Sequence, residues 1–184
     1  AFYAPIIKIA VLVMVPLSIF ESFMPKNISN FYHNNDKMIL ERYIRSINTY
    51  MFYSSFVLLI LLLFFSKSIL LILFGEKFVH LDFLLKCVIL SFLPKIICGP
   101  CGPILVLTRF EKINLLVNFI FLLLSMIIGV FLTMQFGFQG MIYTYIIGMI
   151  LINITFYIIV IKKLKINTLP YFNFLKADFS MINK

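Results

Sequence analysis

Charged residues are scarce in this chain of 184 residues. They make up 12% of the sequence, against 62% hydrophobic residues, and the mean hydropathy is +1.07. Soluble domains carry roughly a quarter of charged residues, so this composition excludes a water-soluble globular protein. It predicts an all-α, polytopic membrane protein without a separate soluble domain.

Residue types that build catalytic and metal centres are also few. The two histidines, His33 and His80, are single and lie in predicted loops, so we predict no metal site. No Ser/His/Asp set, phosphate loop or dinucleotide fingerprint is present, and we predict neither an enzyme nor a cofactor. Of the seven acidic residues, only Glu21 falls near membrane depth. Ion coupling, which needs a carboxylate at depth, therefore uses Glu21 or a part of the protein beyond this chain.

Long apolar runs dominate what is present. Each is about the 20 residues that cross a hydrocarbon core roughly 30 Å thick. We predict five transmembrane helices, at about residues 5–24, 49–65, 81–107, 113–134 and 140–161. The first residue is Ala1 rather than methionine, and the first apolar run begins almost at once. We therefore expect a fragment whose N-terminal part is missing.

The connections between these runs give further expectations. Pro25 is expected to end the first helix, and residues 25–48 to form a polar, partly helical loop. Ser66-Lys67-Ser68 is expected to end the second span, with the short run 69–74 lying at the outer interface. Residues 163–184 form a basic and aromatic tail, whose alternation from Asn167 is typical of an interfacial helix.

The basic residues are distributed unevenly over the two sides of such a bundle. The net charge is +9, and three basic residues, Lys67, Lys77 and Lys86, fall on one side. The positive-inside rule places loop 25–48 and the C-terminus in the cytoplasm, on the opposite side. Because basic residues flank spans rather than forming one face, we predict no nucleic-acid partner. The basic residues on the cytoplasmic side are Lys26, Lys37, Arg42, Arg45, Arg109, Lys112, Lys162, Lys163, Lys165, Lys176 and Lys184.

The third span is rich in helix breakers. A kinked or partly unwound helix is tolerated at membrane depth only where protein or a water-filled cavity surrounds it. We therefore predict that this helix lines a cavity and bends during function. The candidate break and gating residues are Pro94, Gly99, Pro100 and Pro103.

Two lysines lie inside predicted spans. An ionisable group there costs on the order of 3 kcal/mol, so it usually faces a cavity or a partner. Lys95, next to Pro94, and Lys8 are candidates for contact with a phosphate group of an anionic substrate. A structural ion pair or a carbonyl-bound ammonium stays open for Lys95, and snorkelling to the interface stays open for Lys8.

Cys98-Gly99-Pro100-Cys101 has the spacing of thioredoxin-like oxidoreductases. That motif belongs in a βαβ context, and here it lies inside an apolar run. We favour small residues at a helix break. A membrane thiol-disulfide electron carrier is the alternative, although such carriers need cysteines on separate helices and only Cys87 remains.

Several stretches together resemble one known family. They are Phe2-Tyr3-Ala4-Pro5-Ile6-Ile7-Lys8, Met24-Pro25-Lys26-Asn27-Ile28-Ser29, Leu73-Phe74-Gly75-Glu76-Lys77-Phe78, residues 99–112 and Phe136-Gly137-Phe138-Gln139-Gly140. Their order is similar to the C-terminal half of bacterial polysaccharide flippases, the O-antigen (Wzx-type) transporters of the multidrug/oligosaccharidyl-lipid/polysaccharide exporter superfamily. The resemblance covers nearly the whole chain, and its motifs are specific as a set rather than singly.

The resemblance implies a twelve-helix transporter with two lobes, of which this chain is most of the C-terminal one. The substrate would be an undecaprenyl-diphosphate-linked oligosaccharide, moved across the bacterial inner membrane for O-antigen and lipopolysaccharide biosynthesis. Implied partners are this lipid-linked oligosaccharide, membrane lipid, the missing N-terminal lobe and other polysaccharide-assembly membrane proteins. Members are recognised by cationic cavities, so no catalytic set is carried over.

Other interpretations of the function stay open. Within the superfamily these are a lipid II flippase and a multidrug exporter, although a cationic-drug exporter would carry acidic residues at depth. A membrane-embedded polymerase would need a large outer loop, and the outer loops predicted here are short. A purely structural membrane subunit is the remaining alternative.

Overall fold

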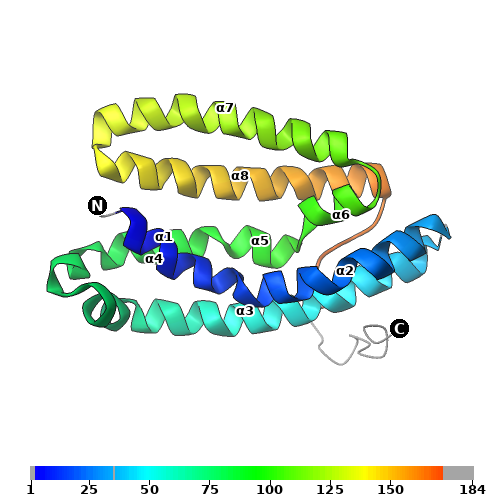
Figure 1. Cartoon of the computed structure of the whole chain (residues 1–184), viewed down its shortest axis with the longest axis horizontal. Coiled ribbons are helices and arrows are strands. Elements are labelled where there is room, and N and C mark those ends of the chain that lie inside the picture. The colour runs from blue at the N-terminus through cyan, green and yellow to red at the C-terminus, as the bar shows by residue number, and fades with distance from the viewer. Residues whose placement is uncertain (1–2, 35, 172–184) are drawn as a thin grey trace.

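The computed structural model describes residues 3–34 and 36–171, and every regular element in these ranges is a helix (Figure 1). Eight are α-helices and two are short 3-10 helices. In chain order they are α1 (Tyr3–Val11), η1 (Leu12–Met14), α2 (Val15–His33), α3 (Lys37–Phe74), η2 (Glu76–Leu81), α4 (Asp82–Ser91), α5 (Leu93–Cys98), α6 (Cys101–Leu107), α7 (Glu111–Phe136) and α8 (Phe138–Leu164).

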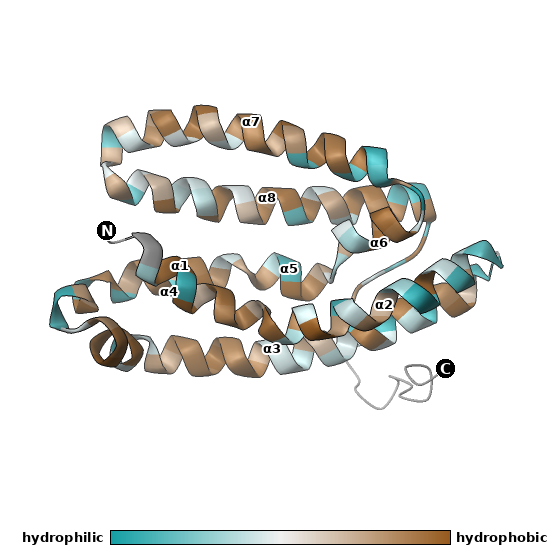
Figure 2. Cartoon of the chain, viewed as in Figure 1, coloured by the Kyte–Doolittle hydropathy of each residue, from teal (hydrophilic) through white to brown (hydrophobic). Residues whose placement is uncertain are grey.

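Four helical stretches are long and apolar enough to cross a membrane: Pro5–His33, α3, α7 and α8. Their bodies are mostly apolar, and the hydrophilic residues gather toward the ends (Figure 2). This is the pattern of a multi-pass membrane protein. The predicted all-helical membrane architecture is confirmed at this level.

The third predicted span, residues 81–107, is not one long helix. Phe92 separates α4 from α5, and Gly99 and Pro100 separate α5 from α6. Pro94 and Pro103 lie in the first turns of α5 and α6, where the amide hydrogen that proline lacks would have no helical partner. The breakers therefore interrupt the helix as expected, and each occupies a position that suits it.

Pro25 does not end the first helix, so this prediction is wrong. α2 continues through Pro25 to His33, and α3 begins at Lys37. The polar segment 25–48 is therefore mostly a helical hairpin. Tyr43 explains why the helix persists, because its hydroxyl accepts a hydrogen bond from Asn27 at 3.0 Å and its ring meets Phe31 edge-on. Tertiary contacts here outweigh the local cost of one proline.

Ser66-Lys67-Ser68 does not end the second span either. α3 runs unbroken to Phe74 and ends at Gly75, whose φ is 86°. With 38 residues, α3 is about 57 Å long at 1.5 Å per residue. Ser66 is buried and donates a hydrogen bond to Asp82, while Lys67 is exposed and can extend toward water. A polar triplet can thus continue a helix when its side chains find partners.

The helices form two layers that enclose the broken segment (Figure 1). α7 and α8 make an antiparallel hairpin, which turns at Gly137 with φ 58°. The other layer holds α1, α2 and α3, and α5 packs against both α3 and α8. The tight α7–α8 pair predicted from the sequence is confirmed. It needs Gly140, where a Cβ would lie 2.2 Å from the Leu132 carbonyl oxygen.

Residues 165–171, named the strap below, follow α8 and are not helical. Lys165 has a left-handed backbone with φ 56°, and the chain then crosses from the end of α8 toward α3 (Figure 1). The interfacial helix predicted from Asn167 is therefore wrong for residues 167–171. The remainder of the predicted tail, residues 172–184, lies outside the described residues.

Candidate functional site at the broken helix

Gly99 marks the break in the chain between α5 and α6. Its φ is 77°, a region that residues with a side chain rarely adopt. The Cys101 N–H bonds the Gly99 carbonyl at 2.9 Å, rather than the Ile97 carbonyl that a continuous helix would offer. The carbonyls of Ile97 and Cys98 therefore need hydrogen-bond donors from outside the helix, because an unpaired carbonyl within a membrane protein is costly.

Asn48 of α3 supplies one of these partners. Its side chain is fully buried, and its Nδ2 donates to the Ile97 carbonyl at 3.1 Å and to the Thr168 carbonyl at 2.5 Å. Its Oδ1 is buried and has no hydrogen-bond partner among the described residues. A Cβ on Gly99 would lie 2.6 Å from this oxygen, so glycine is required here for space as well as for φ.

Thr168 of the strap supplies the other partner. Its side chain is fully buried, and its Oγ1 donates to the Cys98 carbonyl at 2.7 Å. The Cys101 Sγ lies 3.6 Å from the same Oγ1 and 3.3 Å from the Cys98 carbonyl oxygen. Two side chains 120 positions apart thus complete the hydrogen bonding of the break.

The strap is fastened to α3 at two further points. The Tyr171 N–H donates to Thr49 Oγ1 at 2.9 Å, and Arg45 Nε donates to the Leu169 carbonyl at 3.2 Å. The Arg45 guanidinium also lies 4.1 Å from the centre of the Tyr171 ring, which is cation–π distance. Arg45 is half-buried, with Glu41 3.8 Å away.

Lys95 lies on α5, one turn before the break. Its side chain is half-buried, and within the described ranges neither a carboxylate nor a hydrogen-bond acceptor pairs with it. Its backbone carbonyl accepts the Gly99 N–H at 2.9 Å. Lys8, the other predicted substrate contact, is exposed on α1. The described chain shows no contact that brings the two ammonium groups to one site.

The cysteines of the predicted redox motif lie at the break itself. Cys98 and Cys101 are buried free thiols, and Cys87 on α4 is half-buried and free as well. Cys101 is engaged with the Cys98 carbonyl and with Thr168, so both ends of the motif take part in the packing of the break. No three His, Cys, Asp or Glu residues among those described form a metal-binding group.

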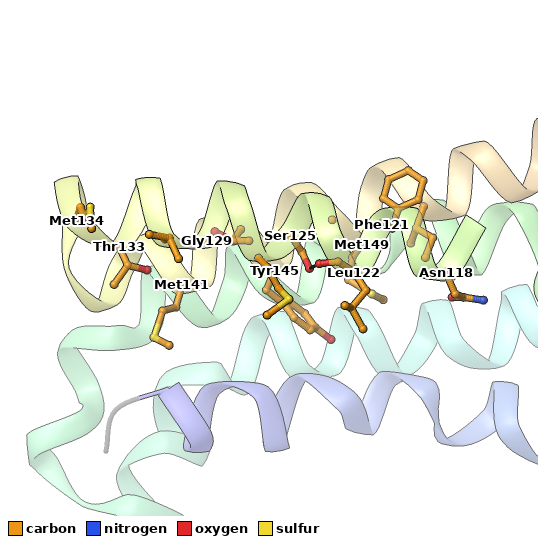
Figure 3. A pocket seen from close by; sticks show the side chains of 15 residues that line it. Asn118, Phe121, Leu122, Ser125, Gly129, Thr133, Met134, Met141, Tyr145 and Met149 are labelled. Atoms are coloured by element: carbon orange, nitrogen blue, oxygen red, sulfur yellow. Dashed lines mark hydrogen bonds between the residues drawn. The ribbon is translucent and has the colours of Figure 1, made fainter. Parts of the chain in front are cut away.

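A second candidate site is a groove along the α7–α8 hairpin (Figure 3). Its volume is about 900 Å³, and no charged residue lines it. Asn118, Ser125 and Thr144 line the groove, and each donates to a carbonyl of its own helix. The groove therefore offers an apolar surface, whereas the directed polar groups are at the break.

Sequence reasoning found the break but missed what closes it. Asn48 and Thr49 stand at the border between the polar segment and the second apolar run, where they look like ordinary boundary residues. The groove had a visible signal, because Ser125, Gly129 and Thr133 recur every four residues on α7. Nothing in the local sequence marked Thr168.

Comparison of the chain with protein-family models, with curated proteins and with solved structures gave no match. The functional argument therefore rests on the residues and their geometry.

Proposed function

We propose that this chain forms most of the C-terminal lobe of a twelve-helix flippase in the bacterial inner membrane. The flippase moves an undecaprenyl-diphosphate-linked oligosaccharide, the O-antigen repeat unit, from the cytoplasmic to the periplasmic leaflet. In this proposal the broken segment α4–α6 crosses the membrane as a fifth span. The basic ends of the helices, with the α2–α3 hairpin and the strap, lie in the cytoplasm.

Lys95 carries the proposal. A half-buried ammonium without an ion pair in the described chain, on a helix between α3 and α8, is costly unless something anionic visits it. A diphosphate provides that charge, and it comes attached to a lipid tail that remains in the bilayer. Lys8, exposed on α1, is available as a second contact.

The mechanism follows from the break. Alternating access rocks this lobe against its partner lobe, while Lys95 neutralises the diphosphate and the sugars cross in a wet cavity. The two interruptions of α4–α6, at Phe92 and at Gly99-Pro100, give this wall of the cavity places to bend. The prenyl chain stays in lipid throughout.

The test is made in the complete transporter, produced from its gene in a host strain that lacks it. Lys95→Ala should reduce surface display of the polysaccharide at least several-fold, whereas Lys95→Arg should retain most of it. Lys162→Ala, at an exposed position near the end of α8, is the matched control and should leave display unchanged. Normal display with Lys95→Ala would remove Lys95 from the mechanism, and normal display without the gene would overturn the proposed function.

A further inference from the structure

The strap covers the break as an extended segment with one face turned inward. Ile166, Thr168 and Pro170 are buried, while Asn167 and Leu169 between them are partly exposed. This alternation is the pattern of an extended chain that lies on a surface. The strap thus lies against α3 and the α5–α6 break, and the space that it fills between them is called the cleft below.

The strap is fastened mainly by polar contacts. Only two apolar side chains, Ile166 and Pro170, are buried along it. The other contacts are polar. They are hydrogen bonds with Asn48, Thr49, Arg45 and the Cys98 carbonyl, the contact of Thr168 with the Cys101 thiol, and the cation–π contact of Arg45 with Tyr171. Hydroxyl groups of water or of a ligand can replace such contacts at little net cost, because hydrogen bonds are exchanged rather than lost.

A defined set of groups would face the cleft if the strap left it. The Cys98 carbonyl would accept hydrogen bonds, and so would the Asn48 Oδ1, which is already buried without a partner. The Asn48 amide would donate. The Thr49 hydroxyl, which gives its own proton to the Arg45 carbonyl, would accept, and the Arg45 side chain would lose both its carbonyl partner and the Tyr171 ring. Closely spaced donors and acceptors with one guanidinium match a polyhydroxylated, anionic ligand.

We propose that the strap is a displaceable plug, and that the hydroxyl-rich sugar part of the substrate takes its place at the break. In the plugged state the Thr168 hydroxyl occupies the position of a sugar hydroxyl on the Cys98 carbonyl. That carbonyl needs a hydrogen-bond donor in either state. A sugar hydroxyl supplies one when the substrate arrives, and the plug then leaves. This inference rests on the proposed function, since it names the site for the sugar of the same substrate.

The test traps the strap in place. Thr168→Cys puts a thiol beside Cys101, whose Sγ lies 3.6 Å from the Thr168 Oγ1. The variant is made in the complete transporter with Cys87 and Cys98 replaced by serine. Copper phenanthroline forms the disulfide in inverted membrane vesicles, and mass spectrometry quantifies the linked peptides. Thr168→Cys with Cys101→Ser is the matched control and should give no linked peptide.

Disulfide formation is compared in two kinds of vesicle, with and without lipid-linked oligosaccharide. The vesicles without it come from a strain that is blocked in the first sugar-phosphate transfer. The plug predicts disulfide formation several-fold slower when the oligosaccharide is present. It also predicts that the disulfide stops translocation and that dithiothreitol restores it.

Equal rates of disulfide formation in both vesicle types, or full translocation with the disulfide formed, would overturn the plug. Neither result touches the proposed function, which in this experiment fails if vesicles with the uncrosslinked protein do not translocate the oligosaccharide. Thr168→Ser, which keeps the hydroxyl, should translocate normally and shows that the position accepts substitution.

Discussion

The Asn48 side chain donates a hydrogen bond of 2.5 Å to the backbone carbonyl of Thr168. The same amide nitrogen donates to the Ile97 carbonyl at 3.1 Å, so Asn48 joins the strap and the broken helix to α3. Asn48 and Thr168 belong to the basic end of the molecule, where the cluster of buried residues that contains Cys98, Cys101 and Ile166 also lies. The geometry of the break therefore depends on contacts between three distant parts of the chain.

Asn48→Ala should destabilise the protein. It leaves the carbonyls of Ile97 and Thr168 without this donor; the Thr168 contact is buried and the Ile97 contact is partly buried. An orphaned buried group costs about 1–3 kcal/mol. We expect a clearly lower apparent melting temperature in detergent. Asn118→Ala is the control, since Asn118 is exposed and bonds only a carbonyl of its own helix. Equal melting temperatures for the two variants would contradict the role given to Asn48.

Gly99→Ala should be destabilising for two separate reasons. The Gly99 backbone, with φ 77° and ψ −168°, lies in a region that is essentially restricted to glycine and costs an alanine about 1–3 kcal/mol. The new Cβ would also crowd Asn48 Oδ1 at 2.6 Å. Gly148→Ala, within α8 and without an atom within 4 Å of its Cβ, should be neutral or slightly stabilising. In a double-mutant cycle, Gly99→Ala combined with Asn48→Ala should cost less than the sum of the single changes. Simple additivity would show that the crowding is absent.

The sequence predicted the break at Gly99 and Pro100 but not the groups that satisfy it. A run of prolines and glycines acts locally, through fixed or permissive backbone angles, and is therefore readable from a short window. The contact between Asn48 and Thr168 links residues 120 positions apart, and no pattern in either segment encodes it. Pro25 shows the converse, because a strong local signal was overridden by Tyr43 and its contacts with the preceding helix.

Lys95 shows a similar division. Its unusual position inside an apolar run was visible in the sequence, and the structure places it half-buried beside the break. The sequence did not indicate where Lys8 lies relative to Lys95. That relationship depends on how α1 packs, and α1 packs mainly against α4.

Asp82→Ala should loosen the start of α4 from the end of α3. The Asp82 carboxylate accepts a hydrogen bond from Ser66 on α3 and pairs with Lys86 at 2.7 Å. Since Lys86 is 42% exposed, we expect a loss of about 1 kcal/mol, most of it from Ser66. Asp82→Asn keeps an acceptor for the Ser66 hydroxyl and should recover part of the loss. The measurement is thermal unfolding in detergent, with Glu76→Ala at an exposed position as the control. If Asp82→Ala and Glu76→Ala unfold alike, the Ser66 contact contributes no stability.

Cysteine labelling from the two sides of the membrane tests whether the broken segment α4–α6 crosses. Single cysteines replace Lys77 in η2 or Gln139 in the first turn of α8, and these elements meet at one end of the bundle. Others replace Lys112 in the first turn of α7 or Lys162 in the last turn of α8, which lie at the opposite end; all four positions are exposed. In intact cells, an impermeant maleimide should label the first two and not the second two, because the positive-inside rule places the more basic end in the cytoplasm. Inverted vesicles should give the opposite result.

Lys77 and Lys112 form the decisive pair, since only α4, α5 and α6 separate them apart from short turns. If both were labelled from the same side, the broken segment would not cross the membrane. The proposed five-span lobe would then be wrong, whereas the four long helices would still span.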